Sequence, residues 1–365
     1  MLVAFRTDAS VEQGTGHLMR CLVLANEFRD RGHNCVFITQ PFLPPLISQI
    51  RNEGHKVILI NPELKQSLGR QHKKQYLNWL GRSLDNDAIE TYSKIVSLPT
   101  DVLIVDHYAI DYEWMKYFAE LDVRKVVIDD LANRSHLCDM LIDQNYGRST
   151  KDYEYLVPRE ATIMAGSKYA FIKDDFCKIR SNALYERPLR NAHRINICMG
   201  GMDKDNSTQD VLGVIKNIQC LKSWNIDIIL RSSSPHVRRV EAFAAKMQPQ
   251  TSIHLDSKNI AELFSVADLA IGAGGVTLWE RCCVGLPSLL LTIADNQLPA
   301  ALAMSNTGAI EYVGDIRDLN WTKKLSSKLG KLVNDPHTLN RMSQAASAIC
   351  DGLGLKNVCD RIECL

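Results

Sequence analysis

The chain has 365 residues, of which 45% are hydrophobic and 23% are charged, and its formal net charge is +1. This length exceeds one ordinary hydrophobic core, and the near-neutral charge argues against a broad nucleic-acid-binding surface. The first apolar run ends at Arg6, too early for a signal sequence, and no stretch has the length and apolar character of a membrane span. We therefore expect two domains in a cytoplasmic protein with neither a membrane nor a nucleic-acid partner.

The cysteines favour a reducing compartment. There are 11 of them, an odd number, and no two have the CxxC spacing of a zinc site. The adjacent pair Cys282 and Cys283 lies in a helical pattern. We expect most of these cysteines to be buried free thiols, and we expect neither a metal nor a cofactor.

Short β-branched runs alternate with helical patterns through the first half of the chain. The run 2–5 precedes a helical stretch over 17–31, which Gly32 is expected to end as a C-cap. Further buried strands are predicted at 34–39, 56–60, 101–106, 125–130, 140–145 and 161–166. This alternation predicts a parallel sheet covered by helices on both faces.

The alternation pauses over 167–192, a polar stretch with Pro188 near its end, and then resumes. The second series of strands is predicted at 194–200, 226–230, 251–255, 268–272, 287–292 and 309–314. We therefore expect two α/β domains, residues 1–174 and 175–365, that face each other and hold a ligand near the carboxyl ends of their strands. The last helix is expected to pack back on the N-terminal domain.

The first motif is Gly14-Thr15-Gly16-His17, directly before the helical stretch. Two glycines allow a tight turn and leave the imidazole accessible, and the positive end of the helix dipole favours its neutral form. His17 is then either a general base or a turn residue with no chemistry, and spacing alone leaves both interpretations open. The motif is neither the dinucleotide fingerprint GxGxxG nor a Walker loop.

Two further glycine pairs follow predicted strands of the second domain. Gly200 and Gly201 precede Asp203-Lys204-Asp205, which resembles a metal-binding DxD motif but is more typical of a helix cap. The strand 268–272 ends at Gly272, Gly274 and Gly275 make a turn, and a helix is expected to begin near Val276 or Thr277. Its first N–H groups would bind a diphosphate without a metal.

Glu280 lies one turn into that helix, where its carboxylate would accept hydrogen bonds from ribose hydroxyls or merely stabilise the helix start. Asn296 and Gln297 follow the next strand, where their amides suit sugar hydroxyls, although the motif Asp295-Asn296-Gln297 alone could merely cap the helix that follows. In the first domain, Tyr108 follows the strand 101–106 and is a candidate for contact with a sugar or phosphate. His107 receives no role, and Asp111 is expected to cap a helix.

Taken together, these motifs resemble the PseG family of UDP-2,4-diacetamido-2,4,6-trideoxy-β-L-altropyranose hydrolases, which act in pseudaminic acid biosynthesis. The resemblance covers nearly the whole chain, in the expected order. It starts at R-x-D-x-S…G-x-G-H-x-x-R-C, and continues through VDHY (105–108), GGMDKDN (200–206), GGVTLWE (274–280), GLPSLLL (285–291) and ADNQ (294–297).

The resemblance implies a GT-B-like fold, related to the glycosyltransferase MurG, with two Rossmann-like domains. His17 would be the general base, and water would displace UDP from the anomeric carbon with inversion. Asp8 and Tyr108 are candidates to orient the water. The substrate-binding residues that it implies are Arg6, Gly14, Gly16, Arg20, Gly200, Gly201, Gly274, Gly275, Val276, Thr277, Glu280, Asn296 and Gln297.

Two positions depart from the family pattern. Gln13 replaces an aliphatic residue, and Ala273 replaces a glycine or serine. Both changes bear on sugar preference more than on reaction type. An inverting MurG-like glycosyltransferase and a non-catalytic nucleotide-sugar-binding module remain alternatives, and we expect a monomer.

Overall fold

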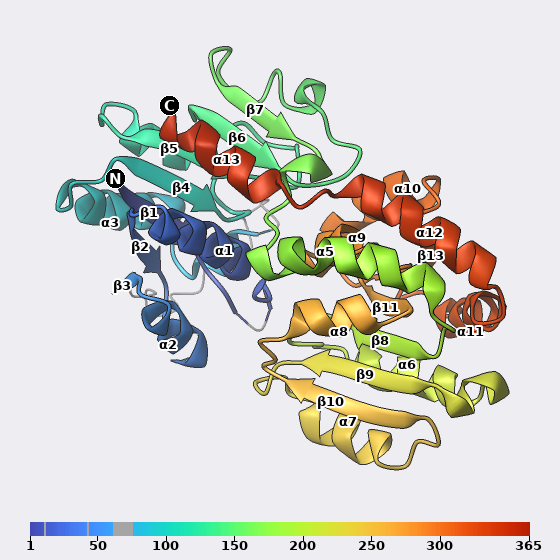
Figure 1. The fold of residues 1–365 in the computed structure, drawn as a ribbon. Helices are drawn as coiled ribbons and strands as arrows, with labels where there is room; N and C mark the ends of the chain where they lie inside the picture. Colours follow the sequence, from blue (N-terminus) through green and yellow to red (C-terminus); the bar gives the residue numbers. More distant parts are fainter. Residues whose placement is uncertain (11, 42–43, 61–75) are drawn as a thin grey trace. The chain divides into compact units, whose positions relative to one another are not determined.

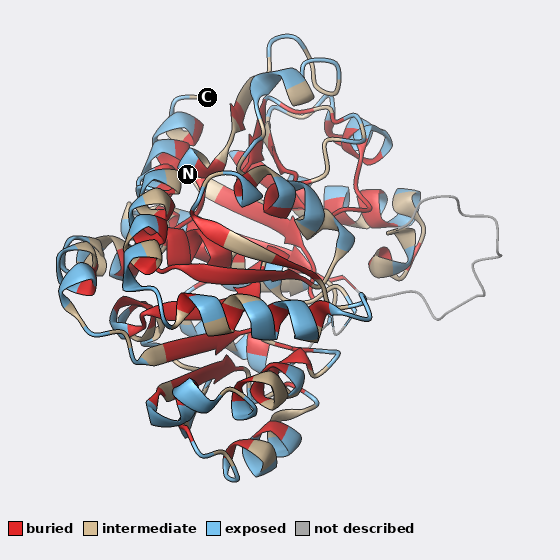
Figure 2. Ribbon diagram, turned by 90° about the vertical axis from the view of Figure 1, so that its right-hand side faces the viewer, coloured by how far each residue is buried: buried red, intermediate tan, exposed pale blue. Residues whose placement is uncertain are grey.

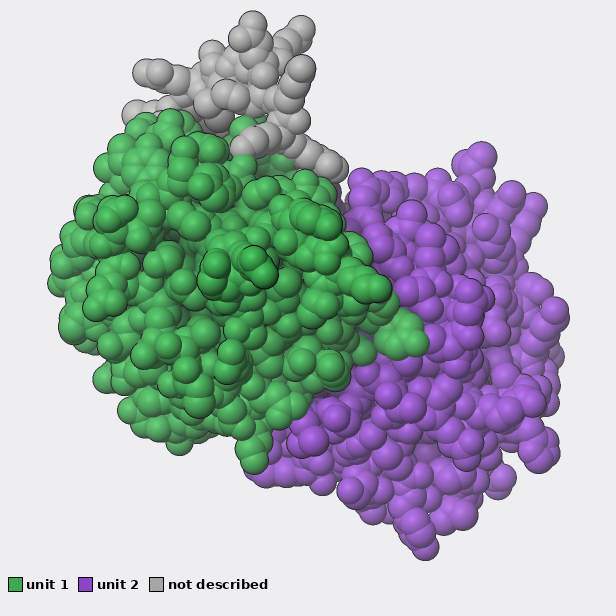
Figure 3. Space-filling model, turned by 90° about the horizontal axis from the view of Figure 1, so that it is seen from above, with its two compact units in different colours: residues 1–171, 354–365 green, residues 172–353 purple. Residues whose placement is uncertain are grey.

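The computed structural model describes residues 1–10, 12–41, 44–60 and 76–365. The chain divides into two compact units, coloured separately in Figure 3. Unit 1 comprises Met1–Phe171 and Gly354–Leu365, and unit 2 comprises Ile172–Leu353. The C-terminal residues therefore return to the unit in which the chain begins.

Within its described residues, unit 1 contains a seven-stranded parallel sheet in the order β3-β2-β1-β4-β5-β6-β7 (Figure 1). The strands are β1 (Leu2–Thr7), β2 (Asn34–Thr39), β3 (Lys56–Leu59), β4 (Val102–Asp106), β5 (Arg124–Ile128), β6 (Met140–Asp143) and β7 (Thr162–Ala165). The α-helices are α1 (Gly16–Asp30), α2 (Pro44–Asn52), α3 (Leu84–Val96), α4 (Tyr112–Met115) and α13 (Gly354–Glu363).

Both faces of this sheet are buried, as a parallel sheet requires. Val3 and Phe5 of β1 belong to a core shared with α1, α2 and α13, whereas Ala4 belongs to the core under α3 and α4. Figure 2 shows most of the central strands in red, and the outer faces of the helices in pale blue. The C-terminal helix α13 is also tied to α1, because Arg31 contacts Asp360 at 2.6 Å.

Across its described length, unit 2 contains a six-stranded parallel sheet in the order β10-β9-β8-β11-β12-β13. The strands are β8 (Arg194–Cys198), β9 (Asn225–Leu230), β10 (Gln250–Leu255), β11 (Leu269–Ala273), β12 (Ser288–Thr292) and β13 (Ile310–Asp315). The α-helices are α5 (Asp174–Glu186), α6 (Ser207–Lys216), α7 (Val237–Ala244), α8 (Ile260–Val266), α9 (Thr277–Cys283), α10 (Leu298–Ser305), α11 (Trp321–Leu332) and α12 (Pro336–Ile349).

The predicted α/β class and every predicted strand are confirmed. Helix α1 ends at Asp30, and Gly32 follows in the left-handed conformation, with φ of +87°, as expected for a C-cap glycine. The polar stretch 167–192 contains α5, which the sequence analysis did not predict. Among the described residues, no helix has both the length and the apolar character needed to span a membrane.

Each sheet reverses its strand order once, and parallel sheets bind ligands at that point. In unit 1 the reversal lies between β1 and β4, whose last residues Thr7 and Asp106 are paired. In unit 2 it lies between β8 and β11, where Cys198 pairs with Gly272. The loops that follow these four strands carry most of the residues predicted to be functional.

Candidate functional site

The loop before α1 is a tight turn that ends at the predicted base. Ser10 and Gly14 are joined by backbone hydrogen bonds, and the Ser10 hydroxyl accepts from the backbone N–H of Gln13. Gly14 has a φ of +79°, a conformation that side-chain-bearing residues rarely adopt. Helix α1 then begins at Gly16, so His17 lies in its first turn.

His17 is held by a carboxylate from the end of β4. Its Nδ1 lies 2.6 Å from Oδ1 of Asp106, which is fully buried. Burial alone would raise the pKa of Asp106, but the charges of Arg20 and His17 and their hydrogen bonds outweigh it and hold that pKa well below its usual range. Nη2 of Arg20 also lies 3.3 Å from Nδ1 of His17, but Oδ1 of Asp106 is closer. Because an ionised carboxylate only accepts hydrogen bonds, we assign the ring proton to Nδ1.

The second ring nitrogen of His17 is therefore the one that can accept a proton. No residue within the described ranges forms a hydrogen bond with Nε2. A histidine fixed in this tautomer by a buried carboxylate is the arrangement that general-base catalysis uses. His17 therefore differs from a turn histidine without a side-chain partner, because Asp106 holds its ring.

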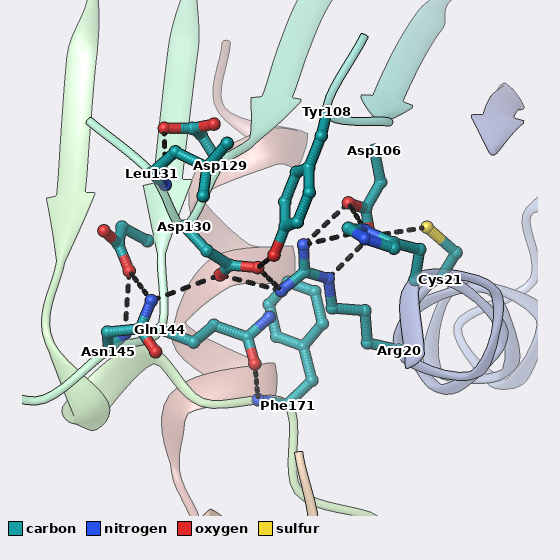
Figure 4. A network of polar contacts seen from close by, with 12 residues as sticks. Arg20, Cys21, Asp106, Tyr108, Asp129, Asp130, Leu131, Gln144, Asn145 and Phe171 are labelled. Carbon is teal, nitrogen blue, oxygen red and sulfur yellow. Dashed lines mark hydrogen bonds and ion pairs between the residues drawn. The ribbon is translucent and has the colours of Figure 1, made fainter. Parts of the chain in front are cut away.

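Arg20 locks Asp106 in place, as Figure 4 shows. Its Nε and Nη2 donate to the two oxygens of Asp106 at 2.6 and 2.7 Å. Its Nη1 donates to both oxygens of Asp130, at 2.8 and 2.7 Å. Arg20 is 5% exposed, so these contacts are screened little by solvent.

Aromatic side chains surround the His17 ring. The ring of Tyr108 meets it edge-on, with centroids 4.4 Å apart, and Trp79 lies 6.4 Å away. Trp79 and Tyr76 both pack on Tyr108 as well. The expectation of an open imidazole is wrong, because His17 is only 7% exposed inside this aromatic shell.

Arg6 and Asp8 form a second charged cluster beside the first. Arg6 contacts Asp8 at 2.7 Å and Asp87 at 2.6 Å. Asp8 also accepts hydrogen bonds from Thr39 and from the backbone of Gln40. Arg6 thus pairs with carboxylates of the protein, and Arg20 pairs with two carboxylates and also lies 3.3 Å, through Nη2, from Nδ1 of His17. The carboxylate that orients His17 is Asp106.

His107 lies near both clusters but is a poor candidate for a base. It is 1% exposed, and its Nδ1 accepts a hydrogen bond from the backbone N–H of Ala109. Burial lowers its pKa to about 3. A histidine that is neither solvent-accessible nor basic has no obvious role in proton transfer.

In unit 2, the two predicted glycine loops follow adjacent strands. Gly200 has a φ of +95°, so a side chain at that position would be strained. At Gly201 a Cβ atom would lie 3.1 Å from Nε of Arg231, the residue that follows β9. The loop therefore brings a guanidinium group next to the backbone at the carboxyl end of β8.

The loops after β11 and β12 also meet. A Cβ atom at Gly274 would lie 3.3 Å from Cβ of Gln297, and one at Gly275 would lie 4.0 Å from its Nε2. The Gln297 side chain accepts from the backbone N–H of Ile293. The predicted helix start is confirmed, since α9 begins at Thr277 with Val276 as its N-cap.

Glu280 is a buried carboxylate, 5% exposed, to which the described residues offer no hydrogen bond or ion pair. Burial raises the pKa of Glu280, and Lys173 and Arg281 offset this only partly. Leaving such a group unpaired costs stability, and residues of this kind often contact a ligand.

Asp203 caps a helix. Its carboxylate accepts from the backbone N–H groups of Ser207 and Thr208, which begin α6. The capping interpretation of the DxD-like motif is therefore confirmed. Over the described residues, no group of three or more His, Cys, Asp or Glu side chains is placed to hold a metal ion. Asp111 also caps a helix, α4, as predicted.

The sequence analysis missed several residues of these clusters. Asp106 lies in the quoted motif VDHY but received no role, and Asp130 and Trp79 were not considered. Arg231 was missed as well, although its position directly after a strand was a usable signal. The contact between His17 and Asp106 joins residues 89 positions apart, which no local pattern reveals.

Comparison with known proteins confirms the resemblance. The chain is 27% identical to the UDP-2,4-diacetamido-2,4,6-trideoxy-β-L-altropyranose hydrolase of Campylobacter jejuni, over 86% of this chain and 99% of that protein. It is 25% identical to the spore coat polysaccharide biosynthesis protein SpsG of Bacillus subtilis, over 95% of this chain and 90% of that protein. No protein-family model matches the chain.

A third relative is longer than this chain. An uncharacterized protein of Methanocaldococcus jannaschii is 26% identical over 296 residues, or 80% of this chain. The matched region covers 55% of that protein, so the chain spans about half of its length.

Solved structures confirm the predicted GT-B-like fold. Acinetobacter baumannii MurG superposes with a TM-score of 0.69 at 13% identity, covering 100% of this chain and 99% of that chain. The UDP-GlcNAc 2-epimerase of Neisseria meningitidis, bound to UDP-GlcNAc, gives a TM-score of 0.66 at 12% identity and covers 100% of both chains.

Proposed function

We propose that this protein hydrolyses a UDP-linked diacetamido-trideoxy sugar to the free sugar and UDP. The observation that carries the proposal is the His17–Asp106 contact of 2.6 Å, which leaves Nε2 of His17 as a proton acceptor at the strand-order reversal of unit 1. The 27% identity to the Campylobacter jejuni hydrolase supports the choice of substrate class.

In the proposed reaction, Nε2 of His17 removes a proton from water as the water oxygen attacks the anomeric carbon. The bond from that carbon to the phosphate oxygen breaks, and UDP leaves with the electron pair, so the configuration inverts. Asp106 stabilises the imidazolium that forms. His17 then releases its proton to solvent, and the sum is UDP-sugar plus water giving sugar, UDP and a proton.

We propose that unit 2 binds the UDP group. A diphosphate is a good leaving group, so stabilising its charge can replace the acid that a glycosidase needs. The backbone N–H groups of Gly200, Gly201 and Gly274–Thr277, with Arg231, would supply that stabilisation, and the reaction would need no metal. Asn296 and Gln297 would hold sugar hydroxyls, and Glu280 would accept hydrogen bonds from the ribose.

In unit 1 we propose that Gly14 and Gly16 let the substrate approach the start of α1, and that Tyr108 lines the site. Arg6 and Arg20 would act by holding carboxylates, as their contacts indicate. Because one chain contains the proposed residues of both units, we propose that the monomer is active.

A direct assay tests the function. Purified protein is incubated with the UDP-sugar and no acceptor, with and without EDTA, and UDP and free sugar are measured. Equal amounts of both products are expected. Turnover only after an acceptor is added would instead identify a glycosyltransferase, and tight binding without turnover would identify a binding module.

Isotopically labelled water tests the point of attack. The label is expected in the anomeric hydroxyl of the released sugar, as observed by mass spectrometry. Label in the phosphate of UDP would show attack at phosphorus and would overturn the mechanism.

Replacing Glu280 by alanine is expected to weaken UDP binding. Loss of hydrogen bonds to a charged group costs about 1.5–3 kcal/mol, which corresponds to a rise in the dissociation constant of about 10- to 150-fold. Isothermal titration calorimetry with UDP measures the change. Glu262→Ala, at an exposed position on α8, is the control and should bind UDP like wild type. An unchanged dissociation constant for Glu280→Ala would remove Glu280 from the nucleotide site.

A further inference from the structure

We propose that Asp130 is a positioning residue that supplies the negative charge needed for His17 to take up a proton, acting through Arg20 and Tyr108. The inference rests on the proposed role of His17 as general base. It adds a residue from the loop after β5 to a site otherwise built from α1 and the end of β4.

The contacts of Arg20 make Asp130 part of the site. Arg20 uses Nε and Nη2 for Asp106 and Nη1 for Asp130, so one guanidinium joins the two carboxylates (Figure 4). Asp106 is fully buried and Asp130 is 8% exposed. Hydrogen bonds between ionised groups in such surroundings are strong and geometrically specific, so the position of Asp130 helps to fix the position of Arg20 and thereby of Asp106.

The charge balance shows what Asp130 adds. Asp106 and Arg20 alone carry one negative and one positive charge, and together they are neutral. Proton uptake by His17 would then leave a net positive charge in a buried cluster, which is unfavourable. With Asp130 the three groups carry a net charge of −1, so the proton taken up by His17 makes the cluster neutral.

Asp130 also holds the aromatic neighbour of His17. The Tyr108 hydroxyl donates to Oδ2 of Asp130 at 2.7 Å, while its ring packs edge-on against His17. The side-chain amide of Asn145 donates to Oδ1 at 3.3 Å. Asp130 thus restrains two groups that touch the site, Arg20 through a charge pair and Tyr108 through a hydroxyl.

Other charged groups near the site do not replace this charge. Arg6 pairs with both Asp8 and Asp87, and these three groups carry a net charge of −1 of their own, but within the described residues none of them contacts His17 or Arg20. Burial keeps His107 neutral. On the far side of Asp130, burial and the charge of Asp130 raise the pKa of Asp143, which also contacts Arg148 at 3.3 Å. Among the cations near Asp130, Arg148 donates from Nη2 to the backbone carbonyl oxygen of Asp130 at 3.4 Å, and Arg134 lies 5.9 Å from the Tyr108 ring and pairs with Asp129.

The test is a titration of His17 that needs no substrate. In the full-length protein, the imidazole signals of His17 are assigned with a His17→Asn variant and followed by NMR against pH, for wild type, Asp130→Asn and Asp130→Glu. In Asp130→Asn, the midpoint of proton uptake should move to lower pH by about one unit, as expected when a nearby opposite charge is lost. Asp130→Glu keeps the negative charge, so the midpoint of proton uptake by His17 should lie close to that of wild type.

Asp129→Asn is the matched control. Asp129 is the neighbour of Asp130 in the chain and is buried, but it pairs with Arg134 rather than Arg20. Thermal unfolding is expected to show a loss of stability in both variants, whereas only Asp130→Asn should move the His17 midpoint. An unmoved midpoint in folded Asp130→Asn, or the same shift in Asp129→Asn, would overturn the inference.

Steady-state kinetics test whether the charge of Asp130 affects turnover. With the UDP-sugar, Asp130→Asn should lower kcat about 10-fold at neutral pH with KM little changed, because a weaker base transfers the proton less well. Added to His17→Asn, the same substitution should have no further effect on kcat, whereas a purely structural role would lower both backgrounds equally. If wild type itself shows no hydrolysis, the proposed function fails, and the NMR titration still decides the role of Asp130.

Discussion

Replacing His17 by asparagine should lower kcat about 10²- to 10⁴-fold, the range that general-base catalysis supplies. Asparagine keeps a polar side chain of similar reach but has no nitrogen that takes up a proton near neutral pH. The dissociation constant for UDP should stay near that of wild type, because the residues proposed to bind UDP belong to unit 2. Steady-state kinetics and calorimetry with UDP measure the two quantities.

The control for this variant is His33→Asn. His33 is also in unit 1, but it follows the end of α1, whereas His17 lies at its start. Nε2 of His33 lies 2.8 Å from Oε1 of Glu363 in α13. Its replacement should leave kcat unchanged, although it removes a contact to the C-terminal helix. Wild-type turnover in His17→Asn would rule out His17 as the base, even if the protein hydrolyses its substrate.

Asp106→Asn should reduce kcat by up to about 10⁴-fold, as expected when the residue that fixes a catalytic imidazole is changed to its amide. The introduced side-chain amide would donate a hydrogen bond toward Nδ1 of His17, so the ring proton would move to Nε2. That nitrogen could then no longer accept a proton from water. The same change leaves Arg20 with one carboxylate instead of two, so a lower melting temperature is also expected.

The matched control is Asp101→Asn, directly before the start of the same strand. Asp101 accepts a hydrogen bond from the backbone N–H of Leu2 at 2.6 Å and is exposed. This variant removes the same charge from unit 1 but should keep full turnover. If Asp106→Asn is folded and turns over at the wild-type rate, the tautomer assigned to His17 is wrong.

Much of the fold could be predicted from local patterns. The runs that form β2 and β4 are short, rich in β-branched residues and largely apolar on both faces, and turn residues or helical patterns bound them. Such runs fit only a strand buried on both sides, so the parallel sheets followed from the sequence. Helix α5 was missed because its 13 residues are mostly polar, and only its packing in unit 2 buries Phe176 and Ala183.

Part of the candidate site was also predictable. Gly14, Gly200 and the start of α9 carry local signals, because a positive φ and a strand-to-helix turn restrict the residues that fit. The carboxylate that orients His17 was not predictable in this way. Asp8 and Tyr108 were the candidates, but the strand pairing of Thr7 with Asp106 places Asp106 beneath the start of α1.

The sequence by itself determined the two α/β sheets, the glycine turns and the histidine at the start of α1, since each depends on residues close together in the chain. Only the tertiary structure decided which nitrogen of His17 is unprotonated, that its ring is enclosed by Tyr108 and Trp79, and that Arg20 joins Asp106 to Asp130. Those contacts span 62 to 110 positions of the chain, and the ones that involve Asp106, Tyr108 and Asp130 depend on the lateral order of β1, β4 and β5. The charge of a buried site depends on all groups that the fold brings together, and no segment contains that information alone.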